Sequence, residues 1–245
     1  MIKPIYLIPR GHEQVMSAFQ DMELILLHIA MKDRKYLKHF RQCKNYKILD
    51  NSAYELRIAL KGRDIMEYAE VMNVQEIVAP DAMLKSLKTK RMTESFIKEN
   101  WEEIQKKKYK IMGVVHGHTK GTWMACFKWM NNNEQIDVIG ISKEDIWWNT
   151  KNRKCVDKVM NRYNQICALR DKIKKPIHLF GATNIQDYFM DWPEYVRSMD
   201  SKTILKIISN KRGWSAKLTH DEIIRYINVI KSINEFLKPR NISKK

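Results

Sequence analysis

Short apolar runs alternate with longer amphipathic segments along most of this 245-residue chain. Aliphatic and β-branched residues dominate the short runs, a composition that predicts strands. The longer segments repeat their apolar positions every three to four residues, as helices do. The predicted strands are Ile5–Ile8, Tyr46–Leu49, Glu76–Ala79, Ile111–Val115, Ile136–Ile141, Ile177–Phe180 and Tyr195–Met199, with a weaker eighth around Ser215–Leu218.

Helix-period segments lie between these strands, near residues 13–31, 63–73, 86–107, 119–131, 153–173 and 184–190. A last helix follows Thr219, which forms a capping-box pattern with Glu222. One face of this helix is apolar and carries Ile223, Ile227, Ile230 and Leu237. The chain therefore predicts a succession of βα units, which is typical of a parallel sheet covered by helices.

Seven or eight βα units in this length fit a (β/α)8 TIM barrel, an α/β fold, formed by residues 1–245 as one compact domain. An open, doubly wound sheet is the alternative, because alternation alone does not show closure. The segment Pro9-Arg10-Gly11-His12 after the first strand is neither a GxGxxG fingerprint nor a P-loop. Its sequence weighs against an open nucleotide-binding sheet.

Polar residues follow the predicted strands at the points where they end. The segments are Asp50-Asn51-Ser52, Pro80-Asp81, His116-Gly117-His118, Gly140-Ile141-Ser142 and, after the seventh strand, Asp200-Ser201. Parallel strands bring their C-terminal ends to one face of a barrel, so these segments predict an active-site rim. Asp50 and Asp200 supply two carboxylates, the pair used for substitution at the anomeric carbon of a sugar.

Each of these segments also has a simpler interpretation. Asp50 can form an Asx turn, and Asp81 can cap the following helix. His116 and His118, two residues apart at a strand end, are expected to face the same side, which is a spacing found in metal sites. Gly140 and the residues after it can form an ordinary βα turn.

The chain is strongly basic, with a formal net charge of +17. That excess predicts an anionic partner, nucleic acid first, although a lysine-rich solvated surface is the alternative. The basic residues predicted to contact phosphates are Lys151, Arg153, Lys154, Lys211 and Arg212. Trp147 and Trp148 lie beside the first of these clusters and fit either stacking on an extruded base or packing over the barrel mouth.

The four cysteines show no CxxC spacing, which argues against a zinc knuckle or a disulfide framework and for a reducing cytoplasm. The apolar stretch at Ile5–Ile8 is too short for a signal peptide. The longest apolar helical segment, Met22–Met31, is too short to span a bilayer. We therefore expect a soluble cytoplasmic protein with no membrane partner.

The order of these motifs resembles the tRNA-guanine transglycosylase superfamily, and most closely its short phage-type members that act on DNA. The family's Asp-Ser-Gly-Gly-Phe, Asp, Val-Gln-Gly, Gly-Gly-Leu and late Asp motifs are similar to Asp50–Tyr54, Asp81, Val115–Gly117, Ile139–Ile141 and Met199–Ser201. His178–Gly181 resembles the family's Leu-Met-Gly strand. If a phage encodes the chain, the expected location is the host cytoplasm.

This resemblance implies an exchange of guanine in DNA, or less readily in tRNA, for a free 7-deazaguanine base. Asp200 would be the nucleophile that forms a covalent bond to the sugar, and Asp50 the general acid/base. The residues implied to hold the base are Asp81, His116, Gly117, Gly140 and Ile141. The reaction would need no metal, redox cofactor or nucleoside triphosphate.

Three departures from the family pattern matter. His116 replaces the family's Gln, and Ser52-Ala53 replaces its Gly-Gly. The family's C-terminal zinc subdomain has no counterpart, because the last cysteine is Cys167, and this favours DNA over tRNA.

Two further functions compete with base exchange. One is a metal-dependent hydrolase that uses His116, His118, His178 and Asp200. The other is a nucleic-acid-binding barrel that has no catalytic activity.

Overall fold

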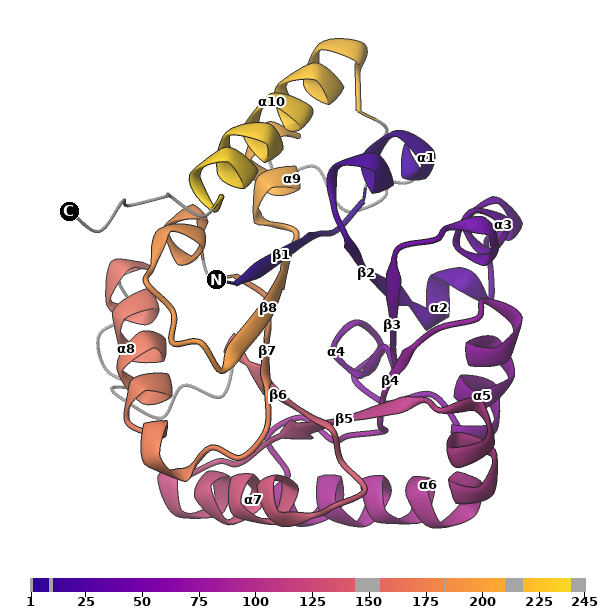
Figure 1. The fold of residues 1–245 in the computed structure, drawn as a ribbon, viewed down its shortest axis with the longest axis vertical. Helices are drawn as coiled ribbons and strands as arrows, with labels where there is room; N and C mark the ends of the chain where they lie inside the picture. Colours follow the sequence, from indigo (N-terminus) through magenta and orange to yellow (C-terminus); the bar gives the residue numbers. More distant parts are fainter. Residues whose placement is uncertain (1, 9–10, 144–154, 183, 210–217, 239–245) are drawn as a thin grey trace, which may run out of the picture.

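A computed structural model describes residues 2–8, 11–143, 155–182, 184–209 and 218–238. Eight strands, all parallel to their neighbours, form a nearly closed barrel with helices around it (Figure 1). In chain order the strands are β1 (Lys3–Tyr6), β2 (Met22–Leu26), β3 (Tyr46–Asp50), β4 (Glu76–Val78), β5 (Lys110–Val115), β6 (Val138–Ser142), β7 (Ile177–Phe180) and β8 (Val196–Ser201). The predicted TIM-barrel fold is confirmed, and the open sheet is excluded.

Most of the helices form an outer ring. They are α1 (Glu13–Met16), α2 (Leu27–Ala30), α3 (Arg34–Gln42), α4 (Ala53–Leu56), α5 (Gly62–Val71), α6 (Ser86–Lys107), α7 (Lys120–Asn132), α8 (Cys155–Cys167), α9 (Thr203–Ile208) and α10 (His220–Phe236). Short 3-10 turns cover Ser17–Phe19, Arg170–Lys172 and Ile185–Phe189. None of the helices in the described ranges is long and apolar enough to cross a membrane.

Seven of the predicted strands are confirmed, with small shifts at their ends, but the eighth strand is β2. The prediction of a helix over residues 13–31 is wrong at Met22–Leu26, which is buried at every position. A strand covered on both faces has no alternation of polar and apolar residues, so its pattern matches a buried helix equally well. The predicted strand at Ser215–Leu218 lies outside the described residues except for Leu218, which is not in a strand.

The helix predictions hold best where the caps are explicit. The Thr219 side chain accepts a hydrogen bond from the Glu222 backbone, and the reciprocal bond is also present, so the predicted capping box starts α10. The predicted helix near 153–173 ends earlier, with α8 at Cys167. Three helices were not predicted: α3, α4 and α9. The latter two are short, with four and six residues, too few to establish a helical period.

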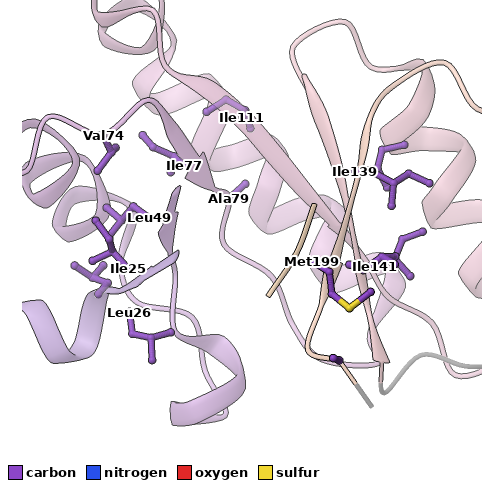
Figure 2. Packing of buried hydrophobic residues seen from close by; sticks show 14 of the residues in the cluster. Ile25, Leu26, Leu49, Val74, Ile77, Ala79, Ile111, Ile139, Ile141 and Met199 are labelled. Carbon is purple, nitrogen blue, oxygen red and sulfur yellow. The ribbon is translucent and has the colours of Figure 1, made fainter. Parts of the chain in front are cut away.

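Alternate strand residues build two separate apolar layers. One layer fills the barrel interior and consists of Ile5, Leu7, Met22, Leu24, Ile48, Val78, Met112, Val114 and Val138. The other lies between the barrel and the helices and includes Ile25, Leu49, Ile77, Ile111, Ile139, Ile141 and Met199 (Figure 2). Side chains alternate between the two faces of a strand. Asp50 therefore shares the inner face with Ile48, and it lies at the C-terminal end of the barrel.

The barrel closes between β1 and β2, which lie next to each other but are the two ends of the hydrogen-bonded strand order. The Gln20 side chain bridges this seam by accepting a hydrogen bond from the Tyr6 backbone N–H at 2.7 Å. Helix α10 crosses the same region: the Tyr226 hydroxyl donates to the Leu7 carbonyl at 3.0 Å, and the Tyr6 hydroxyl donates to Asn234 at 2.7 Å. Side chains thus replace a backbone ladder at the seam.

Candidate functional site

The C-terminal end of the barrel holds a cavity of about 90 Å³. Its floor is the top of the inner apolar layer, formed by Leu7, Leu24, Val78 and Val114. The other lining residues are Leu26, Asp50, Asn51, Ala53, Tyr54, Glu55, Asp81, Met83, His116, Ser142, Lys143, Phe180, Gly181, Asp200 and Lys202. The fold therefore brings Asp50, Asp81, His116 and Asp200 to one pocket, although they come from four different strand ends.

Asp200, on β8, is held by two N–H donors. Its Oδ1 accepts hydrogen bonds from the Gly181 backbone N–H at 3.0 Å and from His178 Nε2 at 3.2 Å. A carboxylate only accepts, so Nε2 carries the hydrogen, and Nδ1 lies 2.9 Å from the Ser198 hydroxyl. Oδ2 receives no hydrogen bond from any residue in the described part of the chain. One oxygen is thus fixed, and the other is available for chemistry.

Asp50 ends β3 and has a different environment. Its Oδ2 accepts the Ser52 backbone N–H at 2.9 Å, so the Asx turn considered from the sequence is present at the pocket wall. Burial raises the pKa of Asp50 well above its usual value, and the nearby charges of Glu55, Asp81 and Asp200 raise it further, against the lowering by the Ser52 N–H. Asp50 therefore holds a proton more readily than an ordinary Asp. Burial also raises the pKa of Glu55, which lines the same pocket.

Asp81 is fixed through both of its oxygens. Oδ1 accepts from Asn51 Nδ2 at 2.6 Å, and Oδ2 accepts from His116 Nε2 at 2.5 Å. The same Asn51 amide group donates to the Ala79 carbonyl at 2.7 Å, which ties β3 to the end of β4. The suggestion that Asp81 caps the next helix is wrong, because α6 begins only at Ser86.

The two histidines after β5 do not face the same side. His116 is 3% exposed and lines the pocket, whereas His118 is exposed to solvent. The expectation failed because β5 ends at Val115, so the two-residue alternation of a strand does not continue to His118. Within the described ranges, no group of three or more His, Cys, Asp or Glu residues is placed to hold a metal ion.

Three residues expected to hold a base, Gly117, Gly140 and Ile141, do not line the pocket. A Cβ on Gly117 would lie 2.3 Å from the Trp123 backbone nitrogen, so this glycine lets α7 approach β5. A Cβ on Gly140 would lie 2.5 Å from the Phe180 ring, and its absence makes room for that ring. Ile141 is buried in the outer layer (Figure 2).

Gly117→Ala is expected to lower the free energy of unfolding by about 1–3 kcal/mol, because the added methyl group overpacks the backbone of α7. The matched control is Gly121→Ala in the same helix, where a Cβ meets only the Thr119 side chain, at 3.9 Å. This control should be neutral or slightly stabilising, since alanine favours helix over glycine. Urea denaturation of both variants checks the difference, and equal midpoints would contradict the assigned contact.

Several lining residues were not predicted from the sequence. Ser142 and Phe180 lie two positions after Gly140 and His178, and Lys202 lies two after Asp200. The same alternation that places Asp50 on the inner face was therefore the available signal. Tyr54 and Glu55 lie in the four-residue helix α4 and Met83 lies in the loop after β4, and neither segment is long enough to show a period.

Buried Arg162, on α8, also escaped prediction. Its guanidinium donates to the carbonyls of Gly181 at 2.7 Å, Phe180 at 2.9 Å and Ile141 at 3.0 Å. These bonds fix the ends of β6 and β7 from behind. Since Gly181 donates its N–H to Asp200, Arg162 positions one of the donors that hold the carboxylate.

The mouth of the pocket carries more basic than acidic side chains, with Glu55 the acidic one, while Asp50, Asp81 and Asp200 lie deeper. Lys143 and Lys202 line the mouth, and the Lys202 ammonium lies 5.4 Å from the centre of the Tyr54 ring. The Arg57 guanidinium lies at the same distance from this ring. Positive side chains at this position favour anionic groups at the rim over the carboxylate-lined interior.

The predicted phosphate contacts at Lys151, Arg153, Lys154, Lys211 and Arg212 lie outside the described residues, as do Trp147 and Trp148. In comparisons with known proteins, the chain matches no protein-family model and no curated protein.

Proposed function

We propose that this chain is a base-exchange transglycosylase that replaces guanine in DNA, rather than in tRNA, with a free 7-deazaguanine. One observation carries the proposal: of the four carboxyl groups that line the pocket, Asp50 and Asp200 have different environments. Asp200 accepts two N–H donors, whereas burial and neighbouring charges raise the pKa of Asp50. Such a division between two carboxyl groups assigns one as nucleophile and the other as acid.

In the proposed first step, Asp200 Oδ2 attacks the sugar C1′ and forms a covalent bond to it. The bond from C1′ to the guanine nitrogen breaks, and Asp50 gives its proton to the departing base, which leaves neutral. In the second step the incoming base bonds to C1′ through its ring nitrogen, and the bond to Asp200 breaks. The proton of that nitrogen returns to Asp50, so both residues end as they began.

The pocket walls also fit a guanine-like base. Asp81 offers a carboxylate to the adjacent amide N–H and amino group of such a base, and His116 with Asn51 holds it in place. The rings of Tyr54 and Phe180 line the same pocket and can stack on a planar ligand. Lys143 and Lys202 at the mouth are suited to phosphate contacts, which position a nucleic acid without reading its sequence.

The test is incorporation of labelled guanine and labelled 7-deazaguanine into duplex DNA, single-stranded DNA and tRNA. Wild type is compared with Asp200→Ala and with Asp171→Ala, a control at an exposed residue before β7, at the other end of the barrel. We expect incorporation into DNA by wild type and by the control, and none by Asp200→Ala. Incorporation into tRNA alone would overturn the choice of DNA. Polynucleotide binding without any incorporation would overturn the enzymatic proposal in favour of a binding protein.

A further inference from the structure

We propose that the loop after β3 opens duplex DNA by packing Leu56 and Ile58 into the base stack beside the extruded nucleotide. We call residues 51–60 the mouth loop. This inference rests on the proposed function and extends it, because it specifies a double-stranded substrate and assigns the residues that unstack it.

The mouth loop is closed on itself by backbone hydrogen bonds. Leu60 donates its N–H to the Asn51 carbonyl at 3.1 Å, and Leu56 donates to the Ser52 carbonyl at 3.0 Å. Ser52, in the left-handed conformation at φ 62°, anchors the base of the loop through its hydroxyl, which lies 2.9 Å from His28 Nδ1. The helix within the loop, α4, lies over the barrel interior and not in the outer ring (Figure 1). The loop is therefore a fixed structure at the mouth of the pocket.

The tip of this loop exposes apolar side chains to solvent. Ile58 is 65% exposed, Leu56 is 37% exposed, and Tyr54 in the pocket wall is 37% exposed. Arg57 between the two aliphatic residues has φ 62° and donates from Nη1 to the Met83 sulfur at 3.7 Å, which links the tip to the loop after β4. Scattered exposed apolar residues are ordinary, but a cluster on a fixed loop beside a pocket is typical of a contact surface.

The surrounding charge indicates the partner. Residues 82–91, which follow β4 and include Met83, carry Lys85, Lys88, Lys90 and Arg91 and no acidic residue. Lys61 and Lys202 add positive charge near the mouth loop, against Glu55 at the pocket mouth. An apolar tip within a basic surface complements a nucleic acid, whose phosphates surround an apolar stack of bases.

The chemistry explains why such a tip is needed. A carboxylate reaches C1′ of a duplex nucleotide only after that nucleotide leaves the stack, which costs free energy because pairing and stacking are lost. Proteins that distort DNA insert Leu, Ile, Met or Phe between base steps and so compensate for lost stacking. A nucleotide in a single strand has no pairing partner to leave and is extruded at lower cost, so it gains less from an inserted side chain. Exposed Ile58 and Leu56 therefore favour duplex DNA as the substrate.

The test compares Ile58→Ser and Leu56→Ser with the control Val71→Ser, at the far end of α5 from the mouth. The exposed fraction of Val71 is 39%, similar to the 37% of Leu56, so the control removes a similar exposed apolar surface. We expect Ile58→Ser to slow exchange in duplex DNA about tenfold and exchange in single-stranded DNA less than about twofold. Val71→Ser should leave both rates within about twofold of wild type.

A second measurement separates this inference from the proposed function. Duplexes in which 2-aminopurine follows each guanine report unstacking by a rise in fluorescence, without any chemistry. If wild type gives this rise and Ile58→Ser does not, while exchange is absent, the mouth loop opens DNA but the proposed function is wrong. Exchange can also occur while Ile58→Ser slows it equally in single-stranded and duplex DNA, or slows it in neither. In that case the insertion of the mouth loop into the base stack is overturned and the proposed function stands. Absence of both exchange and fluorescence change overturns both.

Discussion

Asp200→Asn is expected to lower the rate of base exchange by roughly 10⁴-fold or more, the scale seen when a catalytic nucleophile is removed. An amide has nearly the shape of a carboxylate and still offers an oxygen to the Gly181 N–H and to His178. It cannot form the covalent bond to C1′. The variant should therefore fold, bind DNA and lack chemistry.

The measurement is the initial rate of labelled-base incorporation, combined with trapping of a protein–DNA adduct on denaturing gels when no incoming base is present. Wild type should give the adduct, and Asp200→Asn should not. Ser198→Ala is a graded control, because it removes only the hydroxyl beside His178 Nδ1. We expect it to lower the exchange rate about tenfold, as positioning partners do, with adduct still formed. An adduct in Asp200→Asn would show that another residue is the nucleophile.

Asp50→Asn is expected to lower exchange by about 10²- to 10⁴-fold, the contribution of a general acid/base, and at the same time to stabilise the fold at neutral pH. The stability effect follows from the raised pKa of Asp50, whose first cause is burial. Above the ordinary Asp pKa of about 3.9, the folded protein holds this proton more tightly than the unfolded chain does. Wild-type stability therefore declines as pH rises from that value through the raised pKa.

An asparagine has no proton to lose, so the variant should avoid this decline. Urea unfolding at several pH values between 4 and 8 measures it: the free-energy difference between variant and wild type should grow in favour of the variant as pH rises. Asp171→Asn, at an exposed residue at the other end of the barrel, is the control and should leave the exchange rate unchanged. If Asp50→Asn loses stability at pH 8, Asp50 is ionised and stabilising there, and its assignment as the acid fails.

The alternation rule explains which parts of the pocket could be predicted. Asp50 and His116 were predictable because each continues the inner face of a strand whose apolar residues are plain in the sequence. Asp200 was predictable only from its place at the end of a predicted strand, because the residue two positions before it is Ser198 and not an apolar residue. Their convergence required only that parallel strands end on one face. The hydrogen bonds that distinguish Asp200 from Asp50 depend on His178, Ser198 and a loop conformation, which no single strand pattern encodes.

The failures have physical causes as well. β2 was predicted as helix because its residues are buried on both faces and so show no alternation. Gly117 and Gly140 were expected to admit a ligand, yet the space beside them is filled by Trp123 and Phe180. A sequence shows that a glycine leaves room, but not what fills the room, since that depends on contacts between distant segments.

The seam between β1 and β2 has a consequence for how this protein is made. β1 pairs with β8, so β1 leaves the ribosome well before the residues near Asp200 that provide its backbone partner. At typical synthesis rates of about 5–20 residues per second, that delay is about 10–40 s. Asn234 on α10, the side-chain partner of Tyr6, is translated later still. During synthesis, β1 is thus an unpaired apolar edge until β8 is translated, and the side-chain contacts across the seam are complete only once α10 has followed.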